Sequence, residues 1–268
     1  MGRSCFTNTL VFCLSLATAF AADKQTIEDP EALLQRVRSH ATEHLSQLPN
    51  YTCREVVERL VRSGANWQHL DTVELEVAYV GQQEIFSRPG EAFAEHSVDK
   101  VVTGGTIGNG AFGSHIDVIF SGNVAEFKYV GTAKKDGHQT YRFDLRVPQE
   151  KSRFLVRHRS AQGMAGYQGT VWVDTETLDV VRVDFKVNRI PPHIGVRLIE
   201  ESLHYKKMRI GNNDFVLPRN SELAATDDLG NHSLNMISLD NCREYTGQSV
   251  VKYGPPKEGS ASRDREEK

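Results

Sequence analysis

Near the start of the chain, the hydrophobic residues follow the period of a helix. The apolar residues at every fourth position are Leu33, Val37, Ala41 and Leu45. This spacing places their side chains on one face of an α-helix. Asp29 can cap the first turn, Pro30 suits the first helical position, and Pro49 would end the segment. The pattern therefore predicts one amphipathic helix that needs an apolar surface to cover.

Beyond Pro49 the apolar residues no longer recur with the period of a helix but at every second position. Apolar and polar residues alternate in the stretches 73–79, 125–129, 141–147 and 181–187. Such alternation is typical of strands with one apolar and one solvated face. Turn signals separate the stretches at "KKDGHQ" (134–139), "DTET" (174–177), "GNND" (211–214) and "DDLGN" (227–231). Short connections of this kind indicate an antiparallel meander.

One segment interrupts the strands, at residues 101–122. It opens with the glycine-rich "GGTIGNG" (104–110), which we interpret as a flexible loop or lid. Phe112, Ile116, Ile119 and Phe120 follow at helical spacing. The pattern predicts a short second helix, and its apolar stripe needs the same covered surface as the first.

These elements predict a mainly β fold with some α structure. About nine to eleven strands would bury one face, and two helices are too small to cover that face if it is flat. We therefore expect a strongly curved antiparallel sheet that forms an incomplete barrel, with an N-terminal helix and a short lid helix. A β-sandwich is the alternative, since two sheets can cover each other, although it leaves no natural place for the second helix.

Both ends of the chain differ from the middle in composition. Residues 1–21 combine Arg3, a short apolar run and Ala19-Phe20-Ala21, as in a cleavable signal peptide. The apolar run is too short for a bilayer, which needs about 20 residues, although a retained anchor is the alternative. We expect a periplasmic or secreted protein with a single domain over 22–253, a disordered tail over 254–268 and no transmembrane anchor after cleavage.

Charge and cysteine content narrow the class of protein further. Loss of Arg3 with the signal peptide moves the formal net charge from −3 to −4, so no basic footprint for nucleic acid remains. Cys53 and Cys242 would be the two cysteines left in an oxidising compartment, where such pairs usually form a disulfide. The chain-entropy model gives a bridge over so long a loop roughly 5 kcal/mol. Two buried free thiols are the alternative.

Several segments resemble a known superfamily. "YQGTVWVDTETLDVVRVDFK" (167–186) is similar to the central hairpin of outer-membrane lipoprotein carrier-like (LolA-like) proteins. "GAFGSHIDVIF…AEFKY" (110–129), "FVLPRNSEL" (215–223) and "NCREY" (241–245) resemble segments of secreted bacterial proteins with no assigned activity. The resemblance implies a curved antiparallel half-barrel whose helices cover an apolar interior that holds an acyl chain. It implies no particular functional residue in this chain.

Residues that could carry catalysis or bind a metal form no convincing group. His40 and His44 have the spacing of two metal ligands on a helix, but no third ligand is evident, so we expect solvated side chains. The loop at 104–110 lacks the Lys-Ser/Thr of a phosphate loop. Ser114, His115 and Asp117 are too close in sequence to converge as a catalytic triad. We therefore expect a protein that is not an enzyme and has no cofactor or metal.

The sequence predicts a binding protein that holds a lipid or another apolar ligand in a half-barrel cavity, with an envelope protein as a further partner. The predicted cavity residues are Val73, Val77, Tyr79, Phe127, Tyr129, Phe143, Val183 and Phe185, and the predicted lid residues are Phe112, Ile116 and Phe120. The alternative is a non-catalytic cell-envelope interaction or scaffold module whose interior is filled. Cavity volume separates the two, because pockets for drug-sized ligands measure about 300–1,000 Å³.

Overall fold

The structure is a computed structural model that describes residues 29–62, 64–81, 83–93, 97–108, 114–122 and 124–246, with Ser114 described in its backbone only. The predicted signal peptide (1–21), the predicted tail (254–268) and Phe112 lie outside these residues. Within the described ranges, no helix has the length and apolar character needed to cross a membrane.

The first helix, α1, spans Pro30–Gln47, as the period of four predicts. The Asp29 carboxylate accepts a hydrogen bond from the Glu31 backbone N–H at 3.2 Å, and Leu48 ends the helix just before Pro49. Its buried residues are Leu33, Leu34, Val37 and Ala41. They form one stripe that faces the sheet, because residues three and four apart share a helix face.

Ten antiparallel strands form the main sheet, in the order β3-β2-β1-β12-β11-β10-β9-β8-β5-β4. The strands are β1 (Tyr51–Arg62), β2 (Gln68–Val80), β3 (Gln83–Ser87), β4 (Glu126–Lys135), β5 (His138–Val147), β8 (Gly166–Asp174), β9 (Val180–Arg189), β10 (Val196–Ile210), β11 (Asn213–Asp227) and β12 (His232–Glu244). The end strands β3 and β4 do not pair with each other, so the sheet is not closed into a barrel. Most strands pair with their neighbours in sequence, as short turns require.

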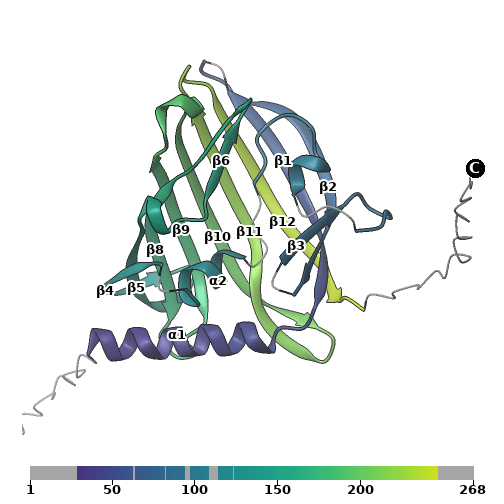
Figure 1. The fold of residues 1–268 in the computed structure, drawn as a ribbon. Coiled ribbons are helices and arrows are strands. Elements are labelled where there is room, and N and C mark those ends of the chain that lie inside the picture. Colours follow the sequence, from purple (N-terminus) through teal and green to yellow (C-terminus); the bar gives the residue numbers. More distant parts are fainter. Residues whose placement is uncertain are drawn as a thin grey trace, which may run out of the picture.

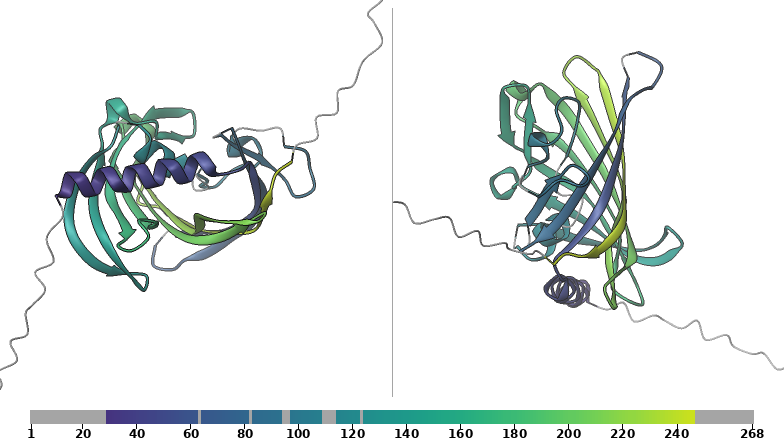
Figure 2. Two further views of the ribbon diagram at one scale, coloured as in Figure 1. Left: turned by 90° about the horizontal axis from the view of Figure 1, so that it is seen from below. Right: turned by 90° about the vertical axis from the view of Figure 1, so that its right-hand side faces the viewer.

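The main sheet is a single layer, and the two helices lie against one of its two faces, which is termed the covered face. In the view from below, the strands form an arc and α1 runs across it (Figure 2). The second helix, α2 (Ser114–Phe120), lies just above α1 (Figure 1). The described residues contain no second sheet large enough for a β-sandwich, because the other sheet has only two strands. The sandwich alternative is therefore wrong.

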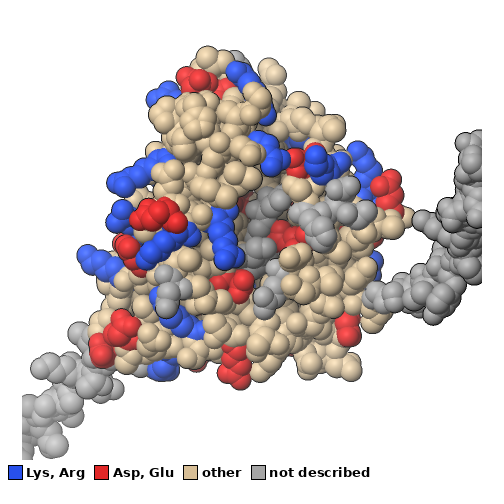
Figure 3. Space-filling model, viewed as in Figure 1, with Lys and Arg blue, Asp and Glu red and all other residues tan. Residues whose placement is uncertain are grey.

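The two-stranded sheet consists of β6 (Leu155–His158) and β7 (Ala161–Met164). Its first strand lies within "RFLVRHRS" (153–160), and this sequence predicts that Arg153, Arg157 and Arg159 lie on one strand face. That interpretation is wrong, because Arg153 precedes β6 and Arg159 lies in the turn with φ +54°. Arg157 pairs with Asp99, and Figure 3 shows charges of both signs intermingled over this side of the molecule.

Three short 3₁₀ segments in the described ranges connect these elements. They are η1 (Val98–Lys100), η2 (Gln149–Lys151) and η3 (Pro192–Ile194). The glycine-rich loop that follows η1 is held to the sheet, since Arg59 donates to the Gly104 carbonyl at 2.6 Å and Asn235 donates to the Thr106 carbonyl at 2.9 Å. Gly104 and Gly105 adopt φ of +74° and +70°, a conformation that favours glycine.

A disulfide joins Cys53 to Cys242, as predicted, across a sequence separation of 189 residues. It links the neighbouring strands β1 and β12 at a bulge, where Thr52 pairs with Arg243 but Arg54 pairs with Asp240. Asn241 has φ +50° in this bulge. An extra residue on one strand bends the strand locally and re-aims a side chain. The bridge therefore connects the two strands of the main sheet that come first and last in the sequence.

Candidate ligand-binding site between the first helix and the sheet

A pocket lies where the C-terminal half of α1 meets the edge of the covered face. Its volume is about 40 Å³. The residues that line it are His40, Ala41, His44, Leu45 and Leu48 from α1 and its end, Tyr51, Ile116, Leu178, Asp179, Val180, Tyr205, Val216, Leu217 and Pro218. Most of these side chains are apolar, so the pocket favours hydrocarbon over polar groups.

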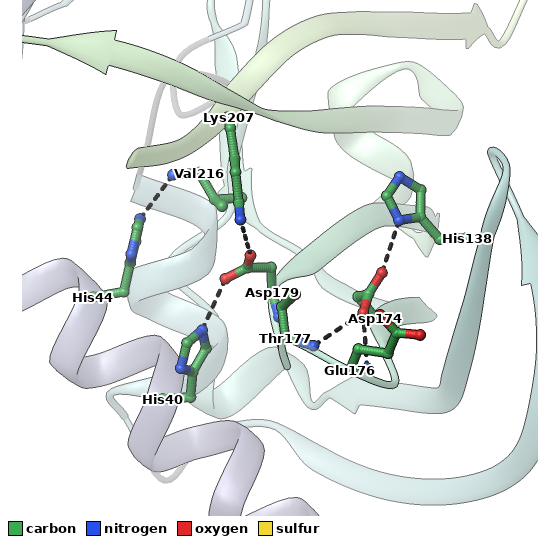
Figure 4. A network of polar contacts seen from close by, with 9 residues as sticks. All are labelled: His40, His44, His138, Asp174, Glu176, Thr177, Asp179, Lys207 and Val216. Atoms are coloured by element: carbon green, nitrogen blue, oxygen red, sulfur yellow. Dashed lines mark hydrogen bonds and ion pairs between the residues drawn. The ribbon is translucent and has the colours of Figure 1, made fainter. Parts of the chain in front are cut away.

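Polar contacts on one side of the pocket fasten α1 to the sheet (Figure 4). His40 Nε2 lies 2.8 Å from Asp179 Oδ1, and Lys207 Nζ lies 3.7 Å from Asp179 Oδ2. His44 Nε2 accepts a hydrogen bond from the Val216 N–H at 3.0 Å. Burial lowers the pKa of His44, which keeps the ring neutral and able to accept. The two histidines are thus not the solvated side chains that the sequence predicts.

The turn that carries Leu178 and Asp179 to α1 is shaped by Asp174. Asp174 Oδ1 accepts hydrogen bonds from the Glu176 and Thr177 N–H groups at 2.8 and 3.0 Å, and His138 Nδ1 lies 2.7 Å from Asp174 Oδ2 (Figure 4). Burial alone would raise the pKa of Asp174, but these hydrogen bonds lower it below its ordinary value. A charged, well-bonded Asp174 therefore fixes the turn that forms one wall of the pocket.

Behind the pocket, the covered face buries three carboxyl groups. Glu55 on β1, Glu84 on β3 and Glu201 on β10 are 5%, 8% and 6% exposed. Burial, followed by the nearby Glu84 and Glu201, raises the pKa of Glu55 to about 8. Burial also raises the pKa of Glu201 to about 7, although Ser221 donates a hydrogen bond to it at 2.9 Å. Each carboxyl thus opposes the ionisation of its neighbours.

Three tyrosines surround these carboxyl groups. Tyr51 pairs across the strands with Tyr79, and Tyr79 pairs in turn with Glu84. The rings of Tyr51 and Tyr79 lie 5.7 Å apart between centroids. Burial and Glu84 raise the pKa of Tyr51, and burial with Glu201 and Glu84 raises that of Tyr205. Because Tyr51 and Tyr205 also line the pocket, the acidic cluster begins where the apolar pocket ends.

His115 on α2 completes this interior cluster. It is 9% exposed, and its Nε2 has no hydrogen-bond partner although it lies 3.6 Å from Glu201 Oε2. Its ring centroid lies 5.0 Å from that of Phe185, and burial lowers its pKa to about 4. The imidazole is therefore neutral near pH 7. Among the described residues, no three His, Cys, Asp or Glu side chains are placed to share a metal ion.

Comparison with known proteins adds structural neighbours but no sequence relative. No protein-family model matches the chain, and no curated protein matches it. A DUF1329 family protein from Desulfovibrio piger is 11% identical with a TM-score of 0.44, covering 81% of this chain and 95% of that one. A putative outer membrane lipoprotein-sorting protein domain from Vibrio parahaemolyticus is 12% identical with a TM-score of 0.42, with the same coverage. The lipoprotein LppX of Mycobacterium tuberculosis is 10% identical with a TM-score of 0.28, covering 82% and 99%.

Identities and TM-scores this low do not transfer a ligand or an activity to this chain.

The predicted cavity and lid residues that the structure describes are buried or partly buried, and among them Ile116 is the one that lines the pocket. The buried ones are Val77, Tyr79, Phe143, Val183, Phe185, Ile116 and Phe120, while Val73, Phe127 and Tyr129 are partly buried. Phe120 stacks on Phe127 at 5.6 Å between centroids, so these side chains pack against one another. Their contact with a ligand stays a prediction.

The sequence interpretation missed the interior cluster, yet a signal for it was present. Residues 51, 53, 55, 57 and 59 of β1 are all buried, so Glu55 occupies an inward position between Cys53 and Val57. A carboxyl group at an apolar position of an alternating strand is unusual, because burial of a charge is unfavourable. In the sequence, His115 is only a neighbour of Ser114 and Asp117, whereas in space it faces Glu201.

Proposed function

We propose that this chain is a secreted or periplasmic binding protein that holds an acyl chain or another apolar ligand in an incomplete barrel. The curved sheet would be the barrel wall, α1 its cover and α2 its lid. The observation that carries the proposal is the apolar pocket at the boundary between α1 and the covered face, lined by Leu45, Leu178 and Val180 among others.

The volume of this pocket requires the cover to move. About 40 Å³ is far below the roughly 300–1,000 Å³ of a site for a drug-sized ligand. The described conformation is therefore a closed one, and a ligand must separate α1 from the sheet to enter. A ligand shifts such an equilibrium only by its preference for the open form, so contacts with the exposed inner face must supply that preference.

The side chains of α1 indicate which part opens at the smallest cost. Leu33 and Val37 are 1% exposed, and burying such a side chain contributes roughly 1.5–3 kcal/mol. The C-terminal half contributes the small Ala41 and the partly buried Leu45. The pocket lies under this half, which supports entry by displacement of the last turns of α1 rather than of the whole helix.

Uptake of an uncharged fluorescent probe tests the proposal. We expect the full-length, oxidised protein to bind N-phenylnaphthylamine, and Ala41→Phe to weaken binding about tenfold or more by filling the pocket. Ser39→Phe is the matched control, because Ser39 is exposed on the same helix. Native mass spectrometry of protein from its own host should show a bound apolar molecule. Repeated recovery of ligand-free protein that takes up no probe would overturn the proposal.

The small volume of the pocket supports a second candidate function, in which the chain is a non-catalytic cell-envelope interaction or scaffold module with a filled interior. In that case the packed aromatic side chains serve stability alone. The same titration separates the two functions, because a filled module binds no probe and Ala41→Phe then lowers stability without any change in binding.

A further inference from the structure

The interior cluster of Glu55, Glu84, Glu201 and His115 is more polar than a packed core requires. His115 Nε2 has no hydrogen-bond partner and points toward Glu201 Oε2 at 3.6 Å. This separation is too long for a direct hydrogen bond. It allows one further polar atom to lie within hydrogen-bond distance of both. Buried polar groups without a partner are rare in native proteins and call for a specific explanation.

We propose that this interior cluster is a head-group subsite for a primary ammonium group, carried by an amphiphile whose hydrocarbon tail lies in the pocket under α1. The inference rests on the proposed function and names its ligand class. The ammonium nitrogen would donate to His115 Nε2 and Glu201 Oε2 at once, and its positive charge would face Glu55 and Glu84.

The electrostatics of the cluster favour a cation over a neutral or anionic group. Burial and the neighbouring carboxyls oppose the charged form of Glu55, and burial and Glu84 oppose that of Glu201. A cation placed among them compensates both effects, because an opposite charge nearby favours the ionised carboxylate. An anionic head group would add to the repulsion instead.

The uncharged aromatic and imidazole groups also suit an ammonium ion. The neutral ring of His115 can accept a hydrogen bond at Nε2 when Nδ1 carries the proton, whereas a protonated ring could not. Tyr51 and Tyr79 offer aromatic faces, which attract cations when water is excluded. A primary ammonium group has three N–H donors, so it can bond to several of these acceptors, while a quaternary ammonium group has none.

The distance between pocket and cluster suits a chain of moderate length. Tyr205 lines the pocket, and Glu201 lies on the same face of β10 four residues away. At about 3.4 Å per residue this separation is roughly 14 Å. Leu203 lies between them and is fully buried, so a tail that spans this distance in the open form would contact apolar side chains. A twelve-carbon tail is therefore a suitable probe.

Competition among amphiphiles with equal tails tests the inference. N-phenylnaphthylamine bound to the full-length oxidised protein is displaced by dodecylamine, dodecanol, dodecanoate or dodecyltrimethylammonium, each below its micelle-forming concentration. Ethylamine is the head group without a tail. We expect dodecylamine to displace the probe at a concentration about tenfold or more below that of dodecanol, with dodecyltrimethylammonium and dodecanoate weaker than dodecylamine and ethylamine inactive.

Two variants locate the effect. Glu201→Gln should abolish the preference for dodecylamine over dodecanol while the probe still binds. Glu222→Gln is the matched control, because Glu222 is exposed on the outer face of β11, and this variant should keep the preference. If Glu201→Gln fails to fold, the ranking of ligands by the unmodified protein decides alone.

The outcomes separate this inference from the proposed function. Equal displacement by dodecylamine and dodecanol overturns the ammonium subsite and leaves the apolar site in place. Binding of ethylamine as tight as that of dodecylamine shows a free-amine site instead and overturns the amphiphile. Absence of probe uptake by the protein overturns the proposed function and the subsite together.

Discussion

The two halves of the main sheet bury different chemistry on the same covered face. The half from β9 to β4 buries an apolar core that includes Phe143, Val171 and Val183, packed under α1 and α2. The half from β3 to β10 carries the disulfide and buries polar groups, among them Glu55, Asn235 and Glu201. In both halves, inward-facing and outward-facing residues alternate along each strand. Stability alone would favour apolar side chains at the inward positions, so the buried polar groups of the polar half depart from that expectation.

Loss of the disulfide should produce the largest effect, and it acts on the polar half. We expect Cys53→Ser together with Cys242→Ser to lower the free energy of unfolding by up to about 5 kcal/mol, because the loop that the bridge closes is long. Urea denaturation of the oxidised protein and the double variant measures the change. Reduction of the unmodified protein should give the same midpoint, and a difference below about 1 kcal/mol would contradict the prediction.

Truncation of the apolar half should have the next largest effect. Phe143 is 1% exposed and lies 5.4 Å from the Tyr129 ring between centroids. We expect Phe143→Ala to cost about 3–5 kcal/mol, as for other large buried aromatics. Phe93→Ala, at a half-buried position away from this core, is the control and should cost less. Equal costs for the two variants would mean that the aromatic cluster contributes no special stability.

The polar half should make stability depend on pH in an unusual direction. The pKa of Glu55 is about 8 and that of Glu201 about 7 in the folded state, against an ordinary 4.5, so the folded protein holds protons that the unfolded chain releases. Stability therefore falls as pH rises from 6.5 to 8, by roughly 1.4 kcal/mol per pH unit for each proton held. Burial lowers the pKa of His115 to about 4, so this residue makes stability rise with pH, but only below pH 6.5.

Urea midpoints at pH 6.5, 7.2 and 8.0 (all about ±0.1) measure this dependence. Glu55→Gln replaces a protonated acid with a neutral amide of similar shape, so it should flatten the slope and raise stability at the highest pH. Glu222→Gln should leave the slope unchanged, since Glu222 is exposed. A stability that rises with pH over this range would show that the buried carboxyls ionise freely.

The sequence predicts the apolar half better than the polar half. Alternation at 141–147 and 181–187 locates β5 and β9, and the helical period at Leu33 and Val37 locates α1. The interior cluster escapes such reasoning because Glu55, Glu201 and His115 come from three distant segments. Only the curvature of the sheet and the packing of α2 bring them together, and a local pattern carries no information on that approach.

The contacts that hold α1 to the sheet should show the smallest effect, and they test whether α1 can act as a cover. His44→Ala removes the acceptor of the Val216 N–H, at a cost of about 1 kcal/mol. Because the pKa of His44 in the folded state is below 6.5, the unfolded chain takes up the proton first, and this contact weakens as pH falls below that value.

Hydrogen exchange of the His44→Ala variant measures this effect. Exchange should accelerate in α1 while β9 and β10 stay protected. Glu43→Ala, on the exposed side of the helix, should leave exchange unchanged. Faster exchange throughout the sheet would mean that α1 belongs to the same cooperative unit as the main sheet, and a helix that cannot open alone could not admit a ligand.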